Sequence, residues 1–171
     1  MSHQEDREQL LQQEEVEVRA VLSQARLAGE RPNFRRNYWS GFYMADFDVN
    51  YSEAIFDEAT LEGTDFSDTD VSSATFKDAM APHFYATDLV AISTEFTGAK
   101  LTGAVFSDSI LVGADFTRAV LTGATFKDTD LTDANFMGAN LENTTFRRVK
   151  INGQEYTGSY SAIPLRGTCP Q

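Results

Sequence analysis

Aspartate recurs at intervals of 20 residues in the middle of the sequence, and carboxylates at a fixed spacing can carry chemistry. The members of this acidic ladder are Asp68, Asp88, Asp108 and Asp128. Paired carboxylates can hydrolyse glycosides, and a row of them can bind a cation or a basic partner. Aspartate also suits a tight turn, because its side chain bonds the backbone of its own turn. The sequence leaves both interpretations of the ladder open.

The other reactive side chains are isolated. His83 follows Pro82 and has no cysteine or second histidine near it, so we predict a surface turn residue rather than a metal ligand or a base. Cys169 is the only cysteine, which excludes an internal disulfide. We therefore expect no catalytic residue, no metal and no cofactor. A pocket that held His83 and Asp88 together would favour an enzyme instead.

Composition narrows the class of protein. The chain of 171 residues suffices for one domain with a sizeable core. It contains no run of about 18 apolar residues that would predict a membrane span, and the polar residues 1–11 lack the features of a secretory signal. We predict a cytoplasmic protein. A net charge of −12 argues against binding to nucleic acid or acidic membranes and favours solubility or a basic partner.

The element that positions the ladder is a repeat with a period of five. Between residues 114 and 141, a large apolar residue returns at every fifth position: Phe116, Leu121, Phe126, Leu131, Phe136 and Leu141. A small residue, Ala or Thr, lies two places before each of them. Neither the helical period of 3.6 nor the strand period of two fits this spacing, so it indicates a repeat architecture.

The units share a pattern of a small residue, Asp or Asn, Leu or Phe, and two polar residues. Examples are ATLEG (59–63), TDFSD (64–68), ADFTR (114–118), TDLTD (129–133), ANFMG (134–138) and ANLEN (139–143). On these units the chain resembles the pentapeptide-repeat family, over about residues 40–157. The resemblance implies an all-β solenoid: a right-handed quadrilateral parallel β-helix, with four pentapeptides in each coil. We expect about six coils.

In such a helix, residues 20 apart stack at ~4.8 Å, the spacing of adjacent strands. One inner column is then predicted to hold Phe56, Phe76, Phe96, Phe116, Phe136 and Tyr156. The opposite column holds Phe66, Phe106, Phe126 and Phe146, and the other two hold Leu61, Leu101, Leu121 and Leu141, and Val71, Leu111, Leu131 and Ile151. Glycine two places after a centre, as at Gly103, indicates a corner with positive φ.

Two segments depart from the period. Residues 31–52 are predicted to form a degenerate first turn from Phe34, Trp39, Phe42, Phe47 and Tyr51. A basic spot in this segment, which we expect to be solvated or to pair with a dipole, comprises Arg31, Arg35 and Arg36. In residues 77–95, Phe84 and Leu89 occupy small-residue positions, and the centres are Ala81, Ala86 and Ala91. We predict a local distortion or bulge there with the register kept, and a bulge is often a functional device.

The two ends are predicted to differ from the repeats. Residues 1–30 fit a helix that ends at Gly29, with an apolar stripe of Leu11, Val18, Leu22 and Ala25. We interpret it as a capping helix for the stack, although a helix that binds a partner or dimerises stays possible. Residues 31–157 form the predicted β-helix, and residues 158–171 a C-terminal tail or cap. Ile163, Pro164 and Leu165 are expected to fold back over the last coil.

An aliphatic patch is predicted on the face of Val71, where Val90, Ile92, Ile110 and Val112 point outward. Tyr85 and Val105 extend it around a corner, and Asp70 and Asp130 lie in the same columns above and below. Exposed apolar patches mark interaction surfaces, although β-branched residues also favour strands at tolerant positions. This patch is our candidate protein-binding site. We expect a monomer, or weak self-association through the patch.

The leading hypothesis is a non-enzymatic structural or protein-binding scaffold with an acidic surface and an unknown protein partner. The alternative follows the family's quinolone-resistance branch, which resembles DNA and binds DNA gyrase or topoisomerase IV. Residues 1–30 hold seven acids and three arginines, which leaves −8 for the stack. Spread over ~29 Å, this is one net charge per ~3.6 Å, against one per ~1.7 Å in DNA. An enzyme is a third class, but regular square coils leave no deep cleft.

Overall fold

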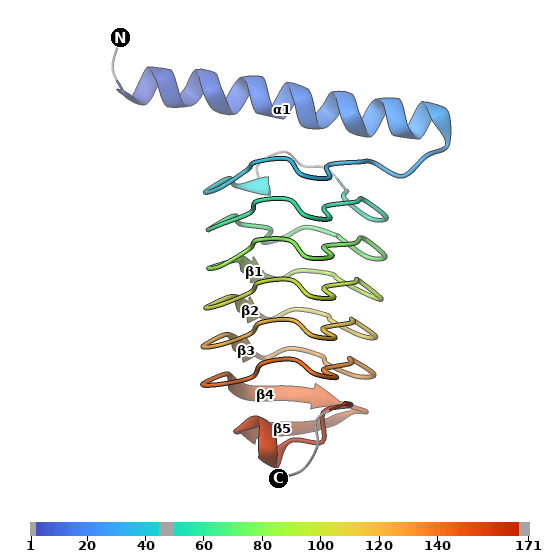
Figure 1. The fold of residues 1–171 in the computed structure, drawn as a ribbon, viewed down its shortest axis with the longest axis vertical. Coiled ribbons are helices and arrows are strands. Elements are labelled where there is room, and N and C mark those ends of the chain that lie inside the picture. The colour runs from blue at the N-terminus through green and yellow to red at the C-terminus, as the bar shows by residue number, and fades with distance from the viewer. Residues whose placement is uncertain (1–2, 45–49, 168–171) are drawn as a thin grey trace.

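The computed structural model describes the backbone of residues 3–44 and 50–167, and their side chains except those of residues 3–11, 14 and 162. Phe47 and Cys169 lie outside the described residues, as does the side chain of Leu11. Helix α1 (His3–Ala28) lies across the N-terminal end of a stack of coils (Figure 1). The C-terminal segment closes the opposite end.

The stack is a right-handed quadrilateral parallel β-helix. One face carries β1 (Tyr85–Thr87), β2 (Val105–Ser107), β3 (Thr125–Lys127) and β4 (Thr145–Ile151), which pair in parallel with residues 20 apart in register. From the second coil onward, the other faces are joined by single bridges at the same step. One row of bridges runs through Asn33, Ile55, Thr75, Glu95, Asp115 and Asn135, one residue per coil, and only its first step, from Asn33 to Ile55, is 22 residues. These six members agree with the predicted six coils.

Phenylalanine rings fill the interior in two columns. In the first, the ring centroids of Phe76 and Phe96 lie 5.0 Å apart, and those of Phe96 and Phe116 also 5.0 Å. In the second, the Phe126 ring lies 5.0 Å from Phe106 and 5.2 Å from Phe146. Rings of different columns meet edge to face. The inward columns are therefore confirmed, and burial of each ring contributes roughly 1.5–3 kcal/mol before entropy.

Small polar residues also point inward and bond the preceding coil. The hydroxyls of Thr64, Thr94 and Thr144 are buried and donate to the carbonyls of Trp39, Val71 and Leu121 at 2.7, 2.8 and 2.8 Å. A buried hydroxyl needs such a partner, because an unpaired one costs about 1–3 kcal/mol. Threonine can therefore replace alanine at these positions without a loss of packing.

The prediction of a distortion or bulge in residues 77–95 is wrong, whereas the register is kept as predicted. The backbone keeps its 20-residue pairing, with Asp65 bridged to Tyr85 and Tyr85 paired with Val105. Phe84 is buried and its ring lies 5.2 Å from Phe66, while Ala86 at the centre is also buried. Both positions face the interior, so exchanging the large and the small residue preserves the filled volume without changing the backbone.

The first coil follows a register that differs from the predicted one. Its buried centres are Phe34, Trp39 and Met44, whereas Phe42 is only half-buried. Paired residues in this coil are 22 apart rather than 20, as in Asn33 with Ile55. The next buried centre in the described part of the chain, Tyr51, follows Met44 after seven residues, and its hydroxyl donates to the Met44 carbonyl at 3.2 Å. Two inserted residues thus account for the irregular spacing.

Helix α1 covers the first coil. Val18 is only 1% exposed and belongs to the same core as Phe34, and Ala25 is buried nearby. The helix ends in a Schellman motif: the Glu30 amide donates to the Ala25 carbonyl at 2.9 Å, and Gly29 has a φ of 67°. The apolar stripe thus closes the exposed end of the core, as a terminal cap must.

The C-terminal end is closed by a reversal of the chain. Strand β5 (Gln154–Gly158) pairs antiparallel with β4, joined by Asn152 and Gly153, whose φ angles of 52° and 80° fit a type I′ hairpin turn. Tyr156 therefore pairs with Val149 and does not extend the phenylalanine column, which corrects that prediction.

A short 3-10 helix, η2 (Tyr160–Ala162), follows the hairpin. After it, Ile163 and Leu165 are buried, and Arg166 bridges Asn135. This segment therefore folds back over the last coil, as the sequence predicts.

Candidate functional site

The acidic ladder occupies corners of the coils with a left-handed backbone. Asp68, Asp88, Asp108 and Asp128 have φ angles of 53–55°, and aspartate tolerates this conformation better than most residues with a side chain. The bonds from an acidic side chain to its own turn are made by another column. There, Asp65 and Asp70 accept from amides two residues later, both at 2.8 Å. Turn chemistry thus accounts for the backbone of the ladder and leaves its carboxylates directed outward.

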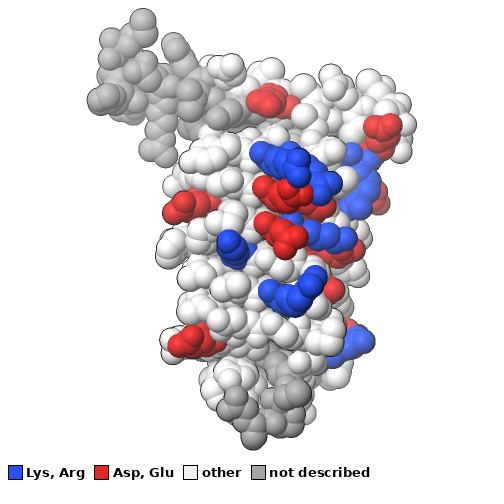
Figure 2. Space-filling model, viewed as in Figure 1, with Lys and Arg blue, Asp and Glu red and all other residues white. Residues whose placement is uncertain are grey.

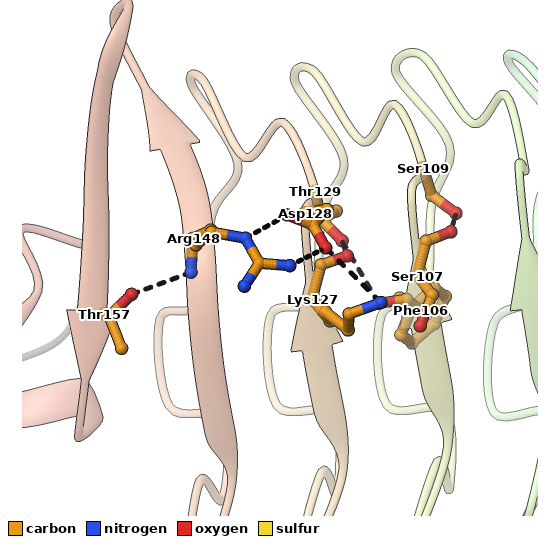
Figure 3. A network of polar contacts seen from close by, with 8 residues as sticks. All are labelled: Phe106, Ser107, Ser109, Lys127, Asp128, Thr129, Arg148 and Thr157. Atoms are coloured by element: carbon orange, nitrogen blue, oxygen red, sulfur yellow. Dashed lines mark hydrogen bonds and ion pairs between the residues drawn. The ribbon is translucent and has the colours of Figure 1, made fainter.

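An arginine terminates the ladder at its C-terminal end. The guanidinium of Arg148 on β4 donates to Asp128 through Nε at 2.6 Å and Nη2 at 2.5 Å, and Lys127 Nζ lies 3.4 Å from the same carboxylate (Figure 3). The hydrogen bond from Arg148 lowers the pKa of Asp128, and the same bond raises the pKa of the guanidinium. A fork of this kind is geometrically specific.

The six patch residues lie on two adjacent coils, at the places that the 20-residue step assigns. Val90 bridges Ile110, and Tyr85 pairs with Val105. The amides on either side of Ile92 bond the carbonyls of Ile110 and Val112 at 2.8 and 2.9 Å, which sets Ile92 beside Val112. The exposed fractions of Tyr85, Ile92 and Ile110 are 48%, 42% and 43%. The valines are half-buried.

Charged residues border the patch along the axis of the stack. Asp70 bridges Val90 on the N-terminal side, and Asp130 bridges Ile110 on the C-terminal side. Lys150 Nζ lies 3.5 Å from the Asp130 carboxylate. The basic residues of this border, Lys127, Arg147 and Lys150, were not singled out by the sequence analysis. The sequence could have indicated Lys150, because it follows Asp130 by 20 residues and residues 20 apart lie side by side.

His83 and Asp88 do not form a catalytic pair in a pocket. Both are exposed, and His83 has a φ of 55°, which makes it the corner residue that the sequence predicts. Among the described residues, no group of three or more His, Cys, Asp or Glu could hold a metal ion.

Hollows lie at the ends of the stack. One of about 510 Å³ lies beside Phe136, Leu141 and Tyr160, and one of about 390 Å³ lies beside Leu22, Pro32 and Asn50. Neither is lined by His83 or by a member of the acidic ladder.

The basic spot of the first coil is engaged in structural contacts. Arg35 and Arg36 bind the Glu58 carboxylate at 2.6 and 2.7 Å, and the hydrogen bond from Arg36 is the main cause of a lowered pKa of Glu58. Arg31 donates to the carbonyls of Glu53 and Ser73 at 2.6 and 2.9 Å. On the face of the molecule shown in Figure 2, acidic and basic side chains lie next to one another. These arginines are therefore paired within the protein.

Two models of pentapeptide repeats match the sequence. One, a pentapeptide repeat region, covers residues 83–156, and the other, with eight copies of the repeat, covers residues 48–79. The chain belongs to the pentapeptide-repeat family. The Asp or Asn that the pentapeptide motif carries at its second position has a structural role here. Its side-chain oxygen accepts a hydrogen bond from the backbone amide two residues later. The Thr117 amide donates to Asp115 Oδ1 at 2.9 Å, and the Glu142 amide donates to Asn140 Oδ1 at 3.0 Å.

Solved pentapeptide-repeat structures resemble the chain. A protein from the Arabidopsis thaliana thylakoid lumen is 26% identical over 64% of this chain and 71% of its own, with a TM-score of 0.40. QnrB1, a plasmid-mediated fluoroquinolone resistance protein, is 20% identical over 79% and 78%, with a TM-score of 0.33. HetL, involved in heterocyst differentiation regulation in the cyanobacterium Nostoc sp. strain PCC 7120, is 16% identical over 79% and 98%, with a TM-score of 0.20. No curated protein matches the chain.

Within the described part of this pentapeptide-repeat protein, no helix has the length and apolar character needed to cross a membrane.

Proposed function

We propose that this pentapeptide-repeat protein is a non-enzymatic scaffold that binds another protein through the aliphatic patch and the acidic ladder beside it. The observation that carries the proposal is the exposure of Tyr85, Ile92 and Ile110, by 42–48%, on neighbouring coils in the middle of the stack. Large apolar side chains that gather on one face of a regular repeat favour a binding surface over scattered surface positions.

The backbone beneath the patch is hydrogen-bonded to the coils on both sides, which suits a display surface. Val90 donates its amide to the Thr69 carbonyl of the preceding coil at 3.0 Å, and Ala91 donates to the Ile110 carbonyl of the next at 2.8 Å. A surface held on both sides needs little reorganisation to bind, so less of the binding free energy is lost to ordering.

The same geometry argues against catalysis by the ladder. Asp68, Asp88 and Asp108 are exposed at convex corners, where water screens their charges and no substrate can be enclosed.

The DNA-mimic alternative is less compatible with the charge pattern. A mimic of duplex DNA needs a dense and continuous array of negative charge. Here the aliphatic patch interrupts the acidic columns, and Arg147, Arg148 and Lys150 add positive charge on the last coil of the same side. Supercoiling by DNA gyrase in the presence of excess purified protein distinguishes the two hypotheses. Inhibition would favour the mimic, and unchanged supercoiling would exclude it.

Three baits, one of them a matched control, test the scaffold proposal. Extract from the source organism is passed over immobilised wild type, an Ile92→Asp/Val112→Asp variant and a Met137→Asp variant, which alters an exposed apolar residue outside the patch. Proteins retained by the wild type and by Met137→Asp should be lost from the double variant. Equal retention by all three baits would assign binding to another part of the stack.

A further inference from the structure

The charge on the surface around the patch differs between its N-terminal and its C-terminal side along the axis of the stack. On its N-terminal side the coil of residues 65–70 carries Asp65, Asp68 and Asp70, and the next two coils add Asp88 and Asp108. Among the described residues, none of these five carboxylates forms an ion pair with a basic side chain. Asp65 and Asp70 bond only neutral groups of this chain, namely backbone amides and, for Asp70, the Asn50 side chain at 3.3 Å.

The C-terminal side of the patch is neutralised within the protein. Arg148 and Lys127 contact Asp128, and Lys150 contacts Asp130. A partner therefore meets negative charge that lacks a counterion on one side of the patch, and charge that is already paired on the other. Such a distribution attracts a partner with basic groups on one side and fixes its orientation.

The backbone around the patch excludes binding by strand addition. Each of the two patch coils is hydrogen-bonded to the coil before it and to the coil after it. The Val90 amide donates to the Thr69 carbonyl of the preceding coil at 3.0 Å, the Val105 amide to the Phe84 carbonyl at 2.8 Å, and the Leu111 amide to the Asp130 carbonyl of the following coil at 2.8 Å. No free sheet edge is available there, so a partner must engage through side chains. An amphipathic helix binds in this way, with apolar anchors at i, i+3, i+4 and i+7.

We infer that the patch receives a short amphipathic helix of another protein, with its apolar side on Ile92 and Ile110 and with Lys or Arg side chains over Asp68 and Asp88. This inference rests on the proposed function and names the chemistry of the partner. Four coil steps, from residue 70 to residue 150, span ~19 Å, which a helix of about 13 residues covers. An anionic lipid surface is excluded by the same carboxylates, because like charges repel.

A second copy of the chain fits this surface poorly. If two copies met patch to patch in antiparallel orientation, Asp65, Asp68 and Asp70 would oppose the partner's coil of residues 125–133. The Asp128 and Asp130 carboxylates of that coil already engage Lys127, Arg148 and Lys150, so the acidic coil would gain no counterion. In parallel orientation the acidic coil would oppose itself. Isologous interfaces require a self-complementary surface, and like charges brought together oppose association.

The test uses three synthetic helical peptides of about 14 residues that share one leucine stripe and carry Lys, Glu or Gln on the flanks. Fluorescence anisotropy measures their binding to the full chain at low salt and at about 0.5 M salt, where surface charges are screened. The Lys peptide should bind most tightly and weaken with salt. Binding of the Glu peptide with equal affinity would overturn the inference.

Variants separate the patch from general attraction to an acidic protein. Ile92→Ser/Ile110→Ser and Asp68→Asn/Asp88→Asn should each weaken the Lys peptide by about tenfold, equivalent to ~1.4 kcal/mol, and the second should also reduce the salt dependence. Met137→Ser and Asp78→Asn, which alter an exposed methionine and a corner aspartate on another face, should bind as the wild type. Equal weakening by these controls would refute the site, and so would a dimer in light scattering that Ile92→Ser abolishes.

The outcome is distinguishable from failure of the proposed function. If the extract experiment yields a partner that requires Ile92 and Val112 but binds Asp68→Asn/Asp88→Asn unchanged, the scaffold function stands and the basic helix is wrong. If no protein requires the patch, both fail.

Discussion

The Phe84 ring stacks on the Phe66 ring with 5.2 Å between centroids and 25° between planes, although Phe84 lies two residues before the centre of its pentapeptide. On the other side, the Phe106 ring lies 5.9 Å away. The column of aromatic rings therefore continues through a coil whose sequence breaks the motif. Ala86 occupies the centre that phenylalanine fills in the coils before and after it.

The stacking of Phe84 on Phe66 predicts that the phenylalanine can be moved from position 84 to position 86 with little loss of stability. Phe84→Ala should destabilise the protein by about 3–5 kcal/mol, the cost typical of removing a buried phenylalanine. The double variant Phe84→Ala/Ala86→Phe restores the motif and should recover most of the loss. Denaturant unfolding of the wild type and both variants measures the free energies. A double variant as unstable as the single one would show that the two inward positions are not interchangeable.

The period of five predicted most of the fold because a square coil forces residues 20 apart into contact. The coil of Phe84 was predicted wrongly, because the period shows that a large and a small residue have exchanged places but not that Ala86 leaves the volume that the Phe84 ring fills. The chain reversal after β4 was missed for another reason: Asn152-Gly153 is a strong local hairpin signal, and the apparent continuation of the period to Tyr156 was followed instead.

The positions of the patch residues were predictable from the sequence, but the ion pairs that the surrounding carboxylates form were not. The step of 20 located Ile92 and Ile110 on adjacent coils because the side-chain direction follows from the position within the unit. Which carboxylates find a counterion depends on the reach of long side chains, as for Arg148 to Asp128. A repeat pattern holds no information about such rotamers.

The packing of α1 predicts a sharp contrast between neighbouring valines. Val18 is 1% exposed and belongs to the core, whereas Val16 is 67% exposed. Val18→Asp should lower the melting temperature, because it loses roughly 1.5–3 kcal/mol of apolar burial and places a carboxylate in the core that contains Phe34 and Trp39. Val16→Asp is the matched control and should melt as the wild type. Similar melting of the two variants would mean that α1 does not cap the stack in solution.

Two glycines in the left-handed region should respond differently to a side chain. A Cβ at Gly167 would lie 2.5 Å from the backbone nitrogen of Met137, whereas one at Gly123 would meet nothing within 4 Å. Gly123→Ala should cost about 1–2 kcal/mol from its positive φ alone. Gly167→Ala should cost more and displace residues 163–167 from the last coil. Amide hydrogen exchange of Phe136, whose amide donates to the Arg166 carbonyl at 2.8 Å, reports this displacement.

The pair of Arg148 and Asp128 predicts a pH-dependent contribution to stability. The hydrogen bond from Arg148 lowers the pKa of Asp128 below its ordinary value in the folded state. A carboxyl with a lowered folded pKa contributes stability above its unfolded pKa, about 3.9, and loses it as the pH falls through the folded pKa. Arg148→Gln should therefore melt below the wild type at pH 7, and the difference should shrink once the pH is below about 4.

Arg147 supplies the control for this prediction. It is exposed on the same strand, and among the described residues it forms no ion pair. Arg147→Gln removes the same charge, so any change in melting that follows from net charge alone should be the same in both variants. The pH-dependent difference should be confined to Arg148→Gln, because only that residue binds a carboxylate whose protonation state changes in this range. If both variants follow the same pH profile, the fork between Arg148 and Asp128 does not stabilise the last coils in solution.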